Sequence, residues 1–228
     1  MFTKGTGTME MIELMRARHS VRRFLAIPVE KDIRSAVDDF VNQQKLASGL
    51  NIQIFYDEPK AFQTLLAHYG SFRNVTNYIA FIGKKEDEIK VGYYGEELVL
   101  KLQELGLNSC WVGVSYSKRK TPVAVNRGEK IIIVVSFGYG QTQGHAHKSK
   151  KPEDVTEVIG EKPSWFDIGV EAALLAPTAV NQQKFKIVCD NGVATIRKNG
   201  IGVYMNVDFG IIKYHIEAVT GQVAEIAR

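Results

Sequence analysis

The stretch that most restricts the fold is an apolar run near the middle of the chain, Ile131–Phe137. It begins with five β-branched residues in a row and ends at Gly138-Tyr139-Gly140. β-Branched side chains favour strands, and an apolar run without polar alternation is typical of a strand that is buried on both faces. We therefore predict a central strand here.

Further strands and helices are indicated on both sides of this run. Polar and apolar residues alternate over Asn51–Tyr56, which predicts a strand, and Tyr78–Ile82 is a short apolar run ended by a glycine. Asn191-Gly192 predicts a two-residue hairpin. Apolar residues at helical spacing predict helices over about Glu30–Leu46, Pro59–Gly70, Gly92–Gly106, Pro163–Ala176 and from about Asp208 onward. This mixture predicts an α+β fold.

The composition restricts the class of protein and its compartment. The 228 residues are 45% hydrophobic and 24% charged, which is ordinary for a soluble globular protein. The net charge of +4 suits an anionic ligand but is too diffuse to indicate nucleic-acid binding. Cys110 and Cys189 form no CxxC motif, and no apolar run approaches membrane-spanning length. We therefore expect a cytoplasmic protein that binds neither nucleic acid nor a membrane.

A basic stretch, Arg18–Phe24, is the strongest candidate for a binding site. It follows a short amphipathic segment, so it lies where a helix ends and a strand or loop begins. Arg18 and Arg22 can grip a phosphate because the guanidinium fork matches phosphate geometry, and Ser20 adds a hydroxyl donor. The alternative is a solvated basic helix end that is favoured by the helix dipole.

The order of these residues resembles the N-terminal signature of the nitroreductase-like flavoproteins, Arg-(Arg/His)-Ser-x-Arg-x-Phe. The resemblance implies an α+β nitroreductase-like fold, with a central and mainly antiparallel sheet flanked by helices. It also implies that Arg18, His19, Ser20 and Arg22 hold the phosphate, the ribityl chain and the pyrimidine edge of FMN.

Two later segments extend this resemblance. Glu104–Trp111 looks like the family segment after which the backbone lies against the flavin, which implicates Trp111, Val112 and Gly113; the alternative is a helix-capping glycine beside a core tryptophan. Lys148 and Lys150 stand before a proline, as the family's second phosphate clamp does, and they would join Arg18 and Arg22 on the phosphate. Taken alone, this lysine cluster is more typical of a solvated loop.

The segment Ala176–Gln183 resembles a third family motif, which packs against the flavin ring, usually from the partner subunit. The resemblance implicates Pro177, Thr178, Ala179 and Asn181, although the terminal Pro-Trp of the family motif is missing. A faint echo relates Ala47–Gln53 to Pro177–Gln183. We therefore expect two unequal halves, residues 1–160 and 161–228, packed into one unit. The molecule would be a monomer built as a pseudo-dimer, or a homodimer.

The resemblance implies an FMN-dependent oxidoreductase that passes hydride from NADH or NADPH, through the flavin, to a small electron-poor acceptor such as a nitroaromatic or a quinone. The cofactor would do the chemistry, so no catalytic side chain is assigned. The alternative is a degenerate, non-catalytic protein that binds flavin or another phosphate ligand. His145 and His147 resemble a metal pair, but no third ligand at suitable spacing accompanies them, and we assign no metal site.

Overall fold

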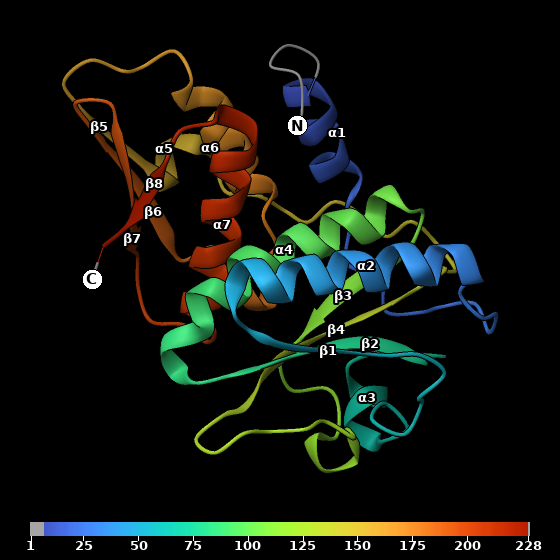
Figure 1. Ribbon diagram of the computed structural model, residues 1–228. Helices are drawn as coiled ribbons and strands as arrows, with labels where there is room; N and C mark the ends of the chain where they lie inside the picture. Colours follow the sequence, from blue (N-terminus) through green and yellow to red (C-terminus); the bar gives the residue numbers. More distant parts are fainter. Residues whose placement is uncertain (1–6, 228) are drawn as a thin grey trace.

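The computed structural model describes residues 7–227 and contains two four-stranded sheets with helices packed around them (Figure 1). In the first sheet the strand order is β1-β2-β4-β3, and every neighbouring pair is antiparallel. Its strands are β1 (Asn51–Phe55), β2 (Asn77–Gly83), β3 (Asn108–Val112) and β4 (Lys130–Gly138). The predicted α+β class, with a mainly antiparallel central sheet, is confirmed.

Helices cover both faces of the first sheet. Figure 1 shows α2 and α4 over one face and the short α3 on the other. The helices are α1 (Gly7–Ala17), α2 (Lys31–Ser48), α3 (Leu65–Tyr69), α4 (Glu88–Glu104), α5 (Pro152–Val155), α6 (Phe166–Leu175) and α7 (Met205–Thr220). Among residues 7–227, no helix is both long enough and apolar enough to cross a membrane.

The prediction of a helix over Pro59–Gly70 is wrong for the first half of that range, because α3 begins only at Leu65. Residues 59–63 form a separate turn, in which the N–H groups of Phe62 and Gln63 both donate to the carbonyl of Pro59. Thr64 then adopts an extended backbone, and its side chain accepts a hydrogen bond from the N–H of Ala67. Because threonine is a strong N-cap residue, the helix begins after it.

β4 lies between β2 and β3 and is buried from Ile131 to Gly138. Its side chains are divided between two hydrophobic clusters: Ile133 and Val135 pack with residues of α2 and α4, and Val134 packs in the cluster that contains Phe62. Both faces of the strand are thus covered, which explains why its sequence lacks polar alternation. The prediction of a central strand is confirmed.

The second sheet has the order β5-β6-β7-β8. Its strands are β5 (Thr156–Ile159), β6 (Phe185–Asp190), β7 (Val193–Lys198) and β8 (Ala224–Ile226). β6 and β7 form the predicted hairpin, and both turn residues, Asn191 and Gly192, have positive φ, as this type of turn requires. β5 and β8 add to the edges as parallel strands and were not predicted. β5, at the end of the expected first half, therefore pairs with the expected second half.

The two sheets are joined through a close crossing of α4 and α7. Gly92 of α4 and Gly210 of α7 lie face to face: a Cβ atom added to Gly210 would lie 2.9 Å from the Cα of Gly92 and 2.7 Å from the backbone nitrogen of Tyr93. A Cβ added to Gly92 would overlap the carbonyl oxygen of Val207. The helices can approach this closely because both positions lack a side chain.

The turn that follows α6 is held by Asp208, in the first turn of α7. Its Oδ1 accepts a hydrogen bond from the N–H of Ala179 over 3.0 Å, and its Oδ2 accepts one from Nε2 of Gln182 over 2.7 Å. The carboxyl is buried, and burial raises the pKa of Asp208 from 3.8 to about 7. Its two hydrogen-bond donors oppose that rise. One buried carboxyl thus fixes the segment that contains Pro177 and Asn181.

We expect the Gly210→Ala variant to be destabilised by roughly 1–3 kcal/mol, because the added methyl group meets backbone atoms of α4 that cannot rotate away. Chemical denaturation measures the change. Ser35→Ala, on the exposed side of α2, is the control and should stay within about 0.5 kcal/mol of the parent protein. A Gly210→Ala protein as stable as the parent would show that the helices do not pack this closely.

The raised pKa of Asp208 makes stability depend on pH. The folded state holds the Asp208 proton up to about pH 7 while the unfolded state loses it near pH 3.8, so the free energy of unfolding should fall as pH rises through this range. Asp208→Asn removes the titration, and the difference between parent and variant should therefore shrink or change sign across the same range. Asp39→Asn, exposed on α2, controls for loss of a surface charge. A difference independent of pH contradicts the assignment.

Candidate functional site

The basic stretch leaves α1 and runs beside β3. The N–H of Arg18 donates to the carbonyl of Leu14 and ends the helix. Ser20 then pairs with Ser109 in a parallel bridge, and the N–H of Val21 donates to the Ser109 carbonyl over 2.9 Å. The other edge of β3 is paired with β4. The stretch therefore extends the sheet at the strand that carries Trp111.

Arg18 is buried, with 3% of its surface exposed, and it faces the buried carboxylate of Glu96 on α4. Arg18 Nε lies 3.7 Å from Glu96 Oε1, which makes an ion pair that is too long for a hydrogen bond. Among residues 7–227, Arg18 Nε has no hydrogen-bond partner. A buried charge is costly unless it is compensated. Glu96 compensates the charge of Arg18 and leaves guanidinium donors for another group.

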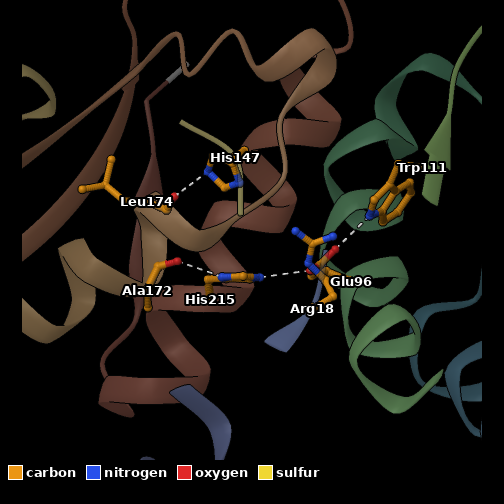
Figure 2. Close-up of polar contacts among 7 residues, drawn as sticks. All are labelled: Arg18, Glu96, Trp111, His147, Ala172, Leu174 and His215. Carbon is orange, nitrogen blue, oxygen red and sulfur yellow. Dashed lines mark hydrogen bonds and ion pairs between the residues drawn. The ribbon is translucent and has the colours of Figure 1, made fainter. Parts of the chain in front are cut away.

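Glu96 is the centre of a buried polar network, which Figure 2 shows. Its Oε2 accepts a hydrogen bond from the indole N–H of Trp111 over 2.8 Å, and its Oε1 lies 3.0 Å from Nε2 of His215. His215 Nδ1 lies 2.8 Å from the carbonyl oxygen of Ala172, which can only accept. His215 therefore faces an acceptor on each side. A proton must therefore lie between His215 Nε2 and Glu96 Oε1, either on the imidazole or on the carboxyl.

A cavity of about 210 Å³ opens beside Arg18. Its wall includes Arg18, His19, His147 and Ser149. His147 Nε2 lies 2.9 Å from the carbonyl oxygen of Leu174. Burial lowers the pKa of His19 and of His147, and in both cases the positive charge of Arg18 adds to the shift. This combination of an arginine and two imidazoles favours an anionic ligand.

The lysine segment and the turn after α6 meet beside this cavity. The carbonyl oxygen of Lys148 accepts hydrogen bonds from Asn181 Nδ2 over 2.9 Å and from Gln183 Nε2 over 2.8 Å. The ammonium of Lys150 donates to the Gln183 carbonyl over 2.7 Å, whereas the side chain of Lys148 is exposed. The structure therefore brings the candidates at the basic stretch, the lysine segment and the turn containing Pro177, Thr178, Ala179 and Asn181 together within one chain.

The candidates on β3 are placed differently. Trp111 contacts Glu96 on α4, as described above. Val112 is buried in the cluster on the other face of the sheet, so it can meet a ligand only through its backbone. The Gly113 carbonyl accepts a hydrogen bond from the Tyr204 hydroxyl over 2.9 Å, and a Cβ at Gly113 would lie 2.5 Å from the Tyr204 ring. Tyr204 therefore already covers one side of Gly113.

Arg22 does not line the cavity and its side chain is exposed. Burial raises the pKa of the Cys110 thiol, and the charge of Arg22 and a hydrogen bond with Ser20 oppose that rise. Arg22 and Ser20 thus lie near Cys110. In this structure Arg18, rather than Arg22, faces the cavity.

Three residues of the site were missed or set aside by sequence reasoning: Glu96, His215 and His147. Glu96 and His215 lie inside amphipathic helices, where they look like any other polar position, and their contact spans 119 residues of sequence. His147 was weighed only as a metal ligand. Within the part of the chain that the structure describes, no three histidine, cysteine or acidic side chains form a group that could hold a metal ion.

Known proteins share this fold. Residues 10–220 match the family described as "Putative TM nitroreductase". A "putative nitroreductase" from Thermotoga maritima aligns with a TM-score of 0.64 and 22% identity, covering 92% of this chain and 82% of that chain. A nitroreductase-like protein from Streptococcus mutans aligns with a TM-score of 0.54 and 15% identity, covering 66% and 98%.

A third solved structure is described as a complex with FMN. This "putative nitroreductase" from Desulfovibrio desulfuricans aligns with a TM-score of 0.51 and 16% identity, covering 67% of this chain and 96% of that chain. No functionally curated protein matches the sequence. At these identities the solved structures establish a common fold, and the family match covers almost the whole chain. The resemblance noted in the basic stretch is thereby confirmed: this chain belongs to the nitroreductase family.

Proposed function

We propose that this chain is an FMN-dependent oxidoreductase, which passes hydride from NADH or NADPH through the flavin to a small electron-poor acceptor such as a nitroaromatic or a quinone. Membership of the nitroreductase family supports the proposal, as does the fold shared with a relative whose structure contains FMN. The observation that carries it is Arg18: a buried guanidinium at the wall of a cavity, whose Nε has no hydrogen-bond partner among the described residues.

The cavity fits the phosphate end of FMN. Its volume of about 210 Å³ leaves room for a phosphate group. A phosphate monoester carries nearly two negative charges at neutral pH. Arg18 can meet part of that charge from inside the cavity, and the exposed Lys148 can meet part of it from outside.

The remaining candidates would hold the rest of the cofactor. His19 and Ser20 lie where the chain passes from the cavity to β3, and the backbone from Trp111 to Gly113 would face the flavin ring. Pro177, Thr178, Ala179 and Asn181 would close the site from the turn after α6, and Lys150 would brace that turn. FMN, when bound, supplies the hydride and electron chemistry, while these residues bind it, orient it and exclude water.

A non-catalytic protein that binds a phosphate ligand is the second candidate. Tyr204 favours it, because its ring packs against Gly113, the glycine expected to face the flavin. The missing Pro-Trp of the third motif favours it as well. Such a protein would use the cavity without a flavin ring against β3.

Titration with FMN and a reductant separates these candidates. We expect one FMN per chain, because the motifs that meet at the cavity come from a single chain. We also expect the yellow absorbance to bleach when NADH or NADPH is added without oxygen. Protein that binds FMN but does not bleach with either nucleotide supports the second candidate, and so does protein that binds inorganic phosphate but not FMN. Protein that binds neither FMN nor phosphate contradicts both candidates.

Lys148→Ala should weaken FMN binding about tenfold or more, which corresponds to roughly 1.5 kcal/mol for a charge-assisted contact. The salt dependence of binding should also flatten. The contacts that Asn181 and Gln183 make to residue 148 use its backbone, so the turn should persist. Lys151→Ala is the matched control, because the Lys151 ammonium is exposed and lies 4.0 Å from Glu153. Equal losses in both variants would indicate a diffuse effect of charge, with no clamp at Lys148.

A further inference from the structure

We propose that His147 is a ligand of the phosphate group and that it takes up a proton from solvent when the phosphate binds. This inference rests on the proposed FMN site. It assigns a role to a residue that sequence reasoning weighed only as a metal ligand.

The geometry of the ring gives the first argument. His147 lines the cavity, and its Nε2 lies 2.9 Å from the Leu174 carbonyl oxygen (Figure 2). A carbonyl oxygen can only accept, so Nε2 carries the hydrogen. In the neutral ring, Nδ1 is then an acceptor. The oxygens of a phosphate dianion are acceptors as well, so Nδ1 can bind the phosphate only after it gains a proton.

The charges around the ring give the second argument. Arg18 and His19 from the basic stretch and His215 from α7 act on His147, and Glu96 faces both Arg18 and His215. Arg16 of α1 lines the same cavity and is paired with Glu13 and Glu171. Lys148 and Lys150 flank the same segment. Burial and the charge of Arg18 both lower the pKa of His147 from its ordinary value of 6.5, which favours the neutral ring at about pH 7.5 while the cavity lacks an anion. A phosphate dianion in the cavity opposes the positive charge of Arg18 and favours the charged ring.

The proton balance follows from the chemistry of the ligand. At about pH 7.5 a phosphate monoester, with its second pKa near 6, is already almost entirely a dianion and has no proton to give. The proton that arrives at Nδ1 must therefore come from solvent. The result is an imidazolium that donates from Nε2 to Leu174 and from Nδ1 to the phosphate. No bond to carbon or phosphorus forms or breaks.

Calorimetry measures this proton directly. FMN is titrated into the protein at about pH 7.5, in buffers that differ in ionisation enthalpy, and the slope of the observed enthalpy gives the protons taken up. We expect a net uptake of up to one proton with FMN and none with riboflavin, which lacks the phosphate. His147→Gln should abolish the uptake and weaken FMN binding. Glutamine can still donate to Leu174, and thermal unfolding checks that the variant is folded.

His145→Gln is the matched control, because His145 lies on the same segment but does not line the cavity, and it should keep the uptake. Two results would overturn the inference: no proton uptake by the parent protein, or proton uptake that persists in His147→Gln.

Failure of the proposed function is distinguishable from failure of this inference. If FMN does not bind, the FMN proposal fails, and inorganic phosphate then probes the cavity alone. The probe experiment follows the His147 ring signal by NMR as pH is varied, with and without phosphate. A higher pKa of His147 with phosphate upholds the inference without the flavin, and an unchanged pKa refutes it.

Discussion

The site depends on one buried carboxylate. Glu96 lies in the interior of α4. Its carboxyl group accepts a hydrogen bond from the indole N–H of Trp111, contacts the ring of His215 and faces the guanidinium of Arg18. An isolated carboxylate at such a depth would cost several kcal/mol. Its partners come from β3, from α7 and from the end of α1, so one side chain ties these three elements together. The cavity opens beside this network.

The chemical character of the cavity follows from the same network. Glu96 faces Arg18 at 3.7 Å, a distance that balances charge without satisfying the donors of the guanidinium. His215 Nε2 lies 3.0 Å from Glu96 Oε1, so the imidazole packs against the same carboxyl that faces Arg18. An anion that enters the cavity finds donors held in place before it arrives, and such preorganisation lowers the cost of binding. The close crossing at Gly92 and Gly210 keeps α4 and α7 near enough for this contact.

Much of the fold could be predicted from local patterns. The apolar run at Ile131–Phe137 became the internal strand β4, and Asn191-Gly192 became the hairpin turn between β6 and β7, because both signals are local and strong. β5 and β8 could not be predicted, since each is short and is a strand only through a parallel partner elsewhere in the chain. The prediction that a helix begins at Pro59 was also wrong, because the side chain of Thr64 caps a helix that begins at Leu65.

The sequence by itself determined the family and the order of the candidate binding motifs. The spacing of Arg18, Ser20 and Arg22 can be recognised in a short segment without knowledge of the rest of the structure. Tertiary structure alone decided that Arg18 faces the cavity while Arg22 does not, and that Glu96, His215 and His147 belong to the site. These three look like ordinary polar residues of helices and a loop. Their roles arise from contacts between residues that are far apart in the sequence. They also arise from burial, which strengthens electrostatic interactions and makes an unpaired hydrogen-bond donor costly.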